Sequence, residues 1–126
     1  MDDTWSDEEL ARGLAWARIV IGVLCFLAPR WTIKMWVGER AEDVVSKMGI
    51  RGLGARDVAI GLGIIHSLDS GSSPRRWLEA SAMADAADAI GTLGGWRDLS
   101  KPRAVMLLVT EVGAALLGVR LADALD

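Results

Sequence analysis

The sequence predicts an all-α protein, a transmembrane bundle of four helices with a short interfacial segment between the first two. Two observations of composition lead to this fold class. Apolar residues make up 52% of the 126 residues with a mean hydropathy of +0.29, and the chain holds fourteen Gly and six Trp. Gly is more frequent in transmembrane helices than in soluble ones, and Trp collects at membrane interfaces. The length fits a single domain over residues 1–126.

The first predicted helix covers residues 7–28. Ser6 precedes it and Glu9 follows three residues later, which is the pattern of a capping box. Pro29 ends the helix because proline has no backbone N–H to donate. The length is close to the roughly 20 residues that cross a bilayer. Beyond the first two turns, the only charge in this helix is Arg18.

A connector of mixed character, residues 30–47, joins this helix to the next. It combines Trp31 and Trp36 with several Lys and Arg residues. This mixture is typical of the lipid headgroup region. Within the connector, residues 39–47 are expected to form a short amphipathic segment that lies on the membrane surface.

Three further helices are predicted along the rest of the chain. The second covers residues 49–68, and five of its first fifteen residues are glycines. Small residues let helix backbones approach each other closely in lipid. After a turn at residues 69–74, the third helix covers residues 75–93 and the fourth covers residues 102–125. The short loops between these helices favour an up-and-down bundle.

Each predicted helix places charge on its small-residue face. Helical spacing of three and four residues puts one set on a single face of the first helix, namely Ala11, Ala15, Arg18, Gly22 and Cys25. The third helix has a polar stripe of Ser81, Asp85, Asp88 and Thr92. The charges on these faces fall near the helix midpoints, so we expect them to meet. The predicted buried network consists of Arg18, Arg56, Asp57, Asp85, Asp88 and Glu111.

This network holds two cations and four acids. An ionised carboxylate without a partner in a low dielectric costs several kcal/mol or takes up a proton. The two acids in excess of the cations predict a protonated carboxyl, a bound cation or water in a cavity. Asp85 and Asp88 are one turn apart and repel each other when both are ionised, so one of them is the expected proton carrier. A structural clamp that locks helices together is favoured over a transport or catalytic relay as the role of this network.

Several classes of function lack the residues that they need. The net charge is −3, so there is no basic surplus to attract nucleic acid. Cys25 and His66 are the only residues of their types, too few for a metal centre. Cys25 is expected to pack as a small apolar residue. Because no nucleophile–base pair or phosphate loop is found, the sequence favours a non-enzymatic protein with no catalytic residue, metal or cofactor.

The distribution of Lys and Arg predicts an orientation. Seven basic residues flank the ends predicted to share one side, which are Arg30, Lys34, Arg40, Lys47, Arg97, Lys101 and Arg103. Four flank the other side, which are Arg12, Arg75, Arg76 and Arg120. The positive-inside rule places the richer side in the cytoplasm and both termini outside. On the outer side, Arg76 and Glu79 are expected to form an interfacial ion pair.

Two short segments carry a resemblance to a known group of proteins. GARDVAIGLG, followed about twenty residues later by DAADAIGTL, resembles small four-helix membrane proteins of unknown function that are common in actinobacteria and loosely DoxX-like. The likeness covers all four predicted helices. Its most specific positions are Gly54, Arg56, Asp57, Asp85 and Asp88. It implies a four-helix integral membrane fold, with an accessory or redox-linked membrane subunit as one possible role.

Three functions stay open on the sequence alone. The first is a multi-pass protein of the cell membrane that binds a small ligand, lipid or membrane partner. Its expected partners are membrane lipid and either a second copy of the chain or another membrane protein. The second is a proton- or cation-coupled transporter, or its subunit, that uses Asp85, Asp88 and Glu111. The third is a soluble helical bundle for protein interaction, because no stretch of eighteen residues is free of charge.

Overall fold

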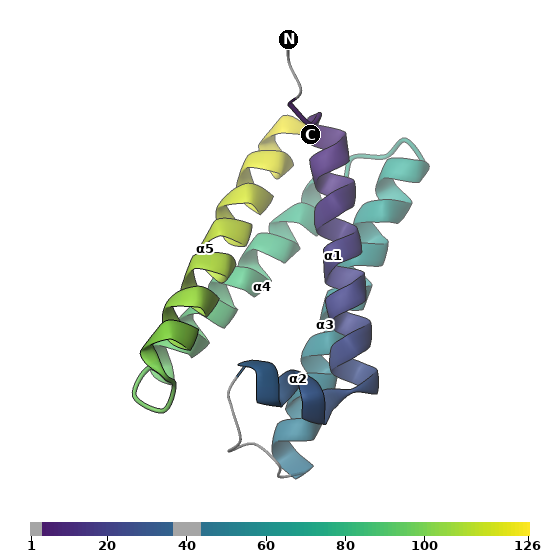
Figure 1. Cartoon of the computed structure of the whole chain (residues 1–126). Helices are drawn as coiled ribbons and strands as arrows, with labels where there is room; N and C mark the ends of the chain where they lie inside the picture. Colours follow the sequence, from purple (N-terminus) through teal and green to yellow (C-terminus); the bar gives the residue numbers. More distant parts are fainter. Residues whose placement is uncertain (1–3, 37–43) are drawn as a thin grey trace.

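The computed structural model describes residues 4–36 and 44–126, and these residues are almost entirely helical (Figure 1). The helices in these ranges are α1 (Asp7–Leu27), α2 (Pro29–Trp36), α3 (Val44–Asp69), α4 (Arg75–Gly94) and α5 (Lys101–Ala124). No strand occurs in the described residues, which confirms the predicted all-α class.

The start of α1 is the predicted capping box. Ser6 Oγ accepts a hydrogen bond from the Glu9 backbone N–H at 3.1 Å, and the Glu9 carboxylate accepts one from the Ser6 N–H at 2.8 Å. Two N–H groups that a helix start would leave without partners are thereby satisfied. The helix ends at Leu27, just before Pro29.

The segment after Pro29 differs from the predicted connector, because residues 29–36 form the helix α2. Proline stops a helix that it follows, but it also suits the first position of a new one, where no N–H is needed. Part of the expected surface segment 39–47 lies outside the described residues. Its last four residues already belong to α3, which therefore starts earlier than residue 49.

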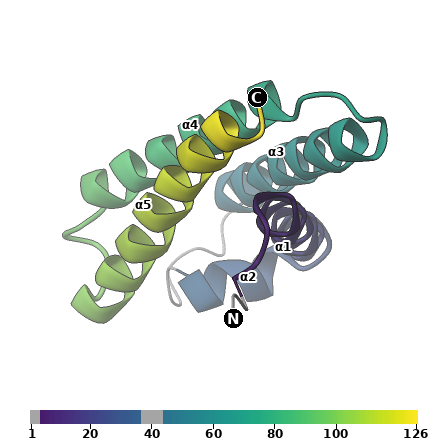
Figure 2. The ribbon, with the colours of Figure 1, turned by 90° about the horizontal axis from the view of Figure 1, so that it is seen from above.

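The four long helices pack as two pairs, α1 with α3 and α4 with α5 (Figure 1). The pairs meet at the end that carries the start of α1, the end of α5 and the α3–α4 turn. From there they diverge toward α2 and the α4–α5 turn. Seen from above, the pairs stand side by side, with α2 packed against α1 and α3 (Figure 2). The fold is therefore closed at one end and open at the other.

Glycines bring α1 and α3 close together. A Cβ atom added at Gly22 or Gly54 would overlap the backbone carbonyl oxygen of the other glycine. A Cβ at Gly61 would lie 2.6 Å from the Ala15 carbonyl oxygen. The buried residues of α1 are the five expected from helical spacing, Ala11, Ala15, Arg18, Gly22 and Cys25. The small-residue face of α1 therefore does pack inward.

The main apolar core lies at the closed end. Ala15 of α1, Ile64 of α3, Leu78 of α4 and Leu121 of α5 are all fully buried there. A smaller cluster, Cys25, Ile33 and Ile50, joins α1, α2 and α3 at the open end. Cys25 thus packs as a small apolar residue, as predicted.

Large apolar side chains also cover the outside of the molecule. Met83 and Ile90 of α4 are 73% and 71% exposed, and Val109 of α5 is 68% exposed. Among the described helices, α1 and α5 are long and apolar enough to cross a membrane. The helices α3 and α4 do not meet that criterion, since both carry charges along their length.

Candidate functional site

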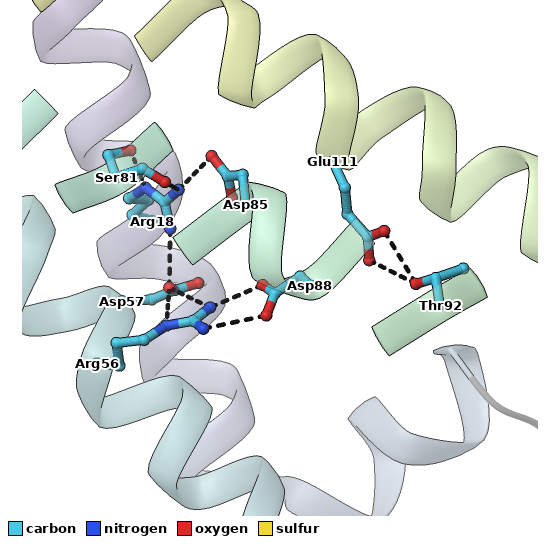
Figure 3. A network of polar contacts seen from close by, with 8 residues as sticks. All are labelled: Arg18, Arg56, Asp57, Ser81, Asp85, Asp88, Thr92 and Glu111. Carbon is cyan, nitrogen blue, oxygen red and sulfur yellow. Dashed lines mark hydrogen bonds and ion pairs between the residues drawn. The ribbon is translucent and has the colours of Figure 1, made fainter. Parts of the chain in front are cut away.

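Arg18 is the centre of a buried ion network (Figure 3). Its Nη1 donates to Asp57 Oδ1 of α3 at 2.8 Å, and its Nη2 forms an ion pair with Asp85 of α4. Its Nε and Nη2 also donate to the hydroxyl and the backbone carbonyl oxygen of Ser81, at 2.7 and 3.0 Å. One guanidinium group therefore joins α1, α3 and α4 at the point where the two helix pairs meet.

Arg56 extends this network along α3 and α4. Its Nη1 and Nη2 donate to the two carboxylate oxygens of Asp88, at 3.0 and 2.7 Å. Its Nε and Nη2 also donate to Asp57 Oδ1, at 3.3 and 3.2 Å. Asp57 is therefore shared by both arginines. The side chains of Arg56 and Asp88 are each 30% exposed, whereas that of Arg18 is 6% exposed, so the network runs from a buried to a more open position.

Glu111 of α5 stands apart from both arginines (Figure 3). Its two carboxylate oxygens lie 3.0 and 2.9 Å from one hydroxyl, Thr92 Oγ1 of α4. A threonine hydroxyl has a single proton to donate, so it serves one of these oxygens at a time. Within residues 4–36 and 44–126, no Lys or Arg forms an ion pair with Glu111.

A cleft of about 720 Å³ opens between the two helix pairs beside this network. Its polar lining includes Arg18, Asp57, Asp85, Asp88, Thr92 and Glu111. Much of the remaining wall is apolar and includes Leu14, Ile21, Trp36, Leu53, Met106 and Leu107. Sites for small molecules usually have volumes of about 300–1,000 Å³ and combine apolar walls with a few polar groups. The cleft has both properties.

The structure brings five of the six predicted network residues into direct contact and places Glu111 on the opposite wall of the same cleft. What these residues do stays a prediction. Ser81 and Thr92 were not among the six, although both were on the predicted polar stripe of α4. Their spacing with Asp85 and Asp88 was the signal that could have identified them.

One predicted ion pair is wrong. Glu79 pairs with Arg75 at 2.8 Å rather than with Arg76. Residues four apart on a helix face each other, and Arg75 has that spacing from Glu79. Arg75 also pairs with Asp126 at 2.6 Å, which ties the start of α4 to the end of the chain.

Trp36, expected at the headgroups, packs against the small cluster at the open end.

No group of three His, Cys, Asp or Glu side chains suited to a metal ion occurs in the part of the chain that the structure describes. Comparison of the chain with protein-family models, with curated proteins and with solved structures finds no match. The geometry of the cleft and its network is therefore the guide to function.

Proposed function

We propose that this chain is a multi-pass integral membrane protein, loosely DoxX-like, whose cleft binds a small amphipathic molecule from the lipid phase. The protein acts as a binding or accessory subunit and catalyses no reaction. The observation that carries this proposal is the cleft itself, which joins a long apolar wall to a compact ion network. A ligand with an apolar body and a polar head matches such a lining.

The hydropathy of the helices and their outward-facing apolar side chains support a membrane location. The helices α1 and α5 have the length and hydropathy of membrane spans. We propose that α3 and α4 cross the membrane with them. The charged residues in the central turns of α3 and α4 pair with one another or with Arg18, and so are kept from lipid. These residues are Arg56, Asp57, Asp85 and Asp88. The outward residues of α3 and α4 include Leu62, Met83 and Ile90, which suit acyl chains.

The proposed orientation has both termini on the outer side. The described residues at the open end include seven basic ones, Arg30, Lys34, Lys47, Arg51, Arg97, Lys101 and Arg103. The positive-inside rule places such an end in the cytoplasm. Arg40, which belongs to the predicted basic set of this end, lies outside the described residues.

The first experiment separates membrane insertion from ligand binding. The expressed chain should stay in the membrane pellet after an alkaline carbonate wash and need detergent for release. Native mass spectrometry of the purified protein should then show a retained small molecule. Release by carbonate alone would contradict the membrane part of the proposal.

Two neighbouring alanines of α4 give a matched test of the cleft. Ala87 lines the cleft, whereas Ala86 is exposed and does not. Ala87→Trp should fill the cleft and remove the retained molecule, and Ala86→Trp should keep it. Equal retention in both variants would contradict binding in the cleft.

The surplus of carboxylates favours a second candidate function. The six-residue network holds two arginines and four acids, so the network carries a net charge of −2 (2 − 4) when all four acids are ionised. A proton- or cation-coupled transporter would use such groups. In proteoliposomes, this function predicts a pH-dependent flux that Asp88→Asn reduces while the protein stays folded.

A further inference from the structure

We propose that the ligand of the cleft is a lipophilic organic monocation whose positive charge pairs with Glu111. This inference rests on the proposed function and specifies the class of ligand. It begins with how the charges in the network are shared. Arg18 contacts Asp57 and Asp85, and Arg56 contacts Asp57 and Asp88. Both guanidinium groups are therefore already engaged by acids on α3 and α4.

Among the described residues that line the cleft, Asp98 and Glu111 are the acids that form no ion pair, and of these two only Glu111 is partly buried, because Asp98 is exposed. Glu111 lies on the wall of a mostly apolar cleft, where an uncompensated charge is unfavourable. The Thr92 hydroxyl satisfies one oxygen at most. A cation bound in the cleft would offset the remaining charge and gain a charge-assisted contact.

The neighbours of Glu111 indicate what the rest of the ligand should be. Leu107 lies one turn before it and Ala114 one turn after it on α5, and both line the cleft. Ala114 leaves space beside the carboxylate, and Leu107 supplies an apolar surface. The aromatic side chain of Trp36 lines the same cleft. Aromatic rings and aliphatic walls favour a cation with apolar substituents over a strongly hydrated one.

Two other classes of ligand fit less well. A divalent metal ion such as Ca²⁺ takes about six to eight oxygen ligands, and no suitable group of acidic side chains gathers at Glu111 among the described residues. An anion would need a free cationic group, but both arginines of the cleft are paired with acids. Of these three classes of ligand, a lipophilic cation fits the charges and the walls of the cleft best.

The test uses two probes of the same shape and opposite charge, tetraphenylphosphonium and tetraphenylborate. Equilibrium dialysis measures their binding to the purified protein in an uncharged detergent. We expect saturable binding of tetraphenylphosphonium to the unaltered protein and weaker or no saturable binding of tetraphenylborate. Glu111→Gln should weaken phosphonium binding by about tenfold or more, as expected for loss of a charge-assisted contact.

Glu79→Gln is the matched control, because Glu79 is an exposed acid of α4 outside the cleft. It should bind tetraphenylphosphonium like the unaltered protein. Each probe also partitions into the detergent, to the same extent for every protein variant at one detergent concentration. Differences in binding between the variants therefore reflect the protein alone. Circular dichroism and gel filtration establish that Glu111→Gln is folded.

Ala114→Trp is a second variant that keeps the carboxylate but fills the space beside it, and it too should lose phosphonium binding. The inference is overturned if phosphonium binds Glu111→Gln or Ala114→Trp as tightly as the unaltered protein. It is also overturned if no saturable phosphonium binding occurs, or if tetraphenylborate binds equally well. The proposed function has a separate test, the comparison of Ala86→Trp with Ala87→Trp. It can hold even if the phosphonium experiment fails, provided that Ala86→Trp retains the bound molecule and Ala87→Trp loses it.

Discussion

The two ends of this molecule use the same four long helices in opposite ways. At the closed end, fully buried residues of all four helices meet, such as Ile64, Leu78 and Leu121. At the open end, the helix pairs separate and leave a cleft of about 720 Å³. Arg18 and its partners lie between these two regions, and the Arg56–Asp88 pair continues the contact between α3 and α4 toward the more open side.

This difference shows how a small bundle can be both stable and hollow. Apolar packing at one end fixes the relation of the two pairs, so the other end need not be filled. The ion network lies between the packed apolar core and the cleft. Its charged groups pair with one another, and the same groups line one side of the cleft. Substitutions at the closed end should therefore change stability, and substitutions at the open end should change what binds.

The largest loss of unfolding free energy is expected for a substitution in the ion network, at Arg18. Arg18→Ala would leave Asp85 buried without a cation and Asp57 with Arg56 alone, which costs about 3–5 kcal/mol of unfolding free energy. Reversible unfolding in SDS, followed by circular dichroism, measures this. Arg120→Ala is the control, since the pair of Arg120 with Asp7 is exposed and its loss should change stability very little. Equal effects in the two variants would contradict the structural role of the ion network.

The next effect concerns the closed end itself. Leu78→Ala should lower the unfolding free energy by about 2–4 kcal/mol, because Leu78 is fully buried and its removal leaves a cavity. Leu107→Ala, on the wall of the cleft, should lose less than about 1 kcal/mol, since space already exists on one side of it. The same SDS titration compares them. A larger loss at Leu107 would mean that the cleft is closed in solution.

A smaller effect is expected where α1 crosses α3. Gly54→Ala places a Cβ against the Gly22 carbonyl oxygen and should cost about 1–3 kcal/mol. Gly13→Ala is the matched control on α1, because nothing lies within 4 Å of a Cβ there. It should stabilise the protein by up to about 1 kcal/mol through helix propensity. Melting temperatures should therefore shift in opposite directions, and a shared direction would contradict the close crossing.

The smallest effect on stability is expected at the open side of the network. Asp88→Asn weakens the contact with Arg56, whose guanidinium keeps Asp57 as a partner. Because both side chains are 30% exposed, the loss should be about 1 kcal/mol or less and should decrease with added salt. A loss as large as that of Arg18→Ala would identify Asp88 as part of the structural clamp. A folded variant with altered pH-dependent flux would favour the transporter.

Sequence patterns predicted which faces point inward more reliably than how the helices meet. The spacing of Ala11, Ala15, Arg18, Gly22 and Cys25 identified the buried face of α1 because helical periodicity is a local property. The helix α2 was missed because Pro29 can end one helix and also begin another. Periodicity alone does not distinguish these two roles.

The partners within the network depended on tertiary arrangement. Spacing placed Arg18 and Arg56 at the same depth as four acids, but it did not determine that Asp57 is shared or that Glu111 is apart. Those outcomes follow from the divergence of the two helix pairs, which moves α5 away from α1 and α3. The cleft has the same origin, since no local pattern encodes the angle between two pairs.

The position of Arg18 has a consequence for biosynthesis. In the proposed membrane protein, α1 is translated first, and the acids that pair with Arg18 are made later. Asp57 follows 39 residues after Arg18, which corresponds to about 2–8 s at a synthesis rate of roughly 5–20 residues per second. During that interval α1 carries an arginine without its partner, at a cost of about 2.5–3.5 kcal/mol near the bilayer centre. The translocation machinery should therefore hold α1 until α3 arrives, so that the two helices enter the lipid together.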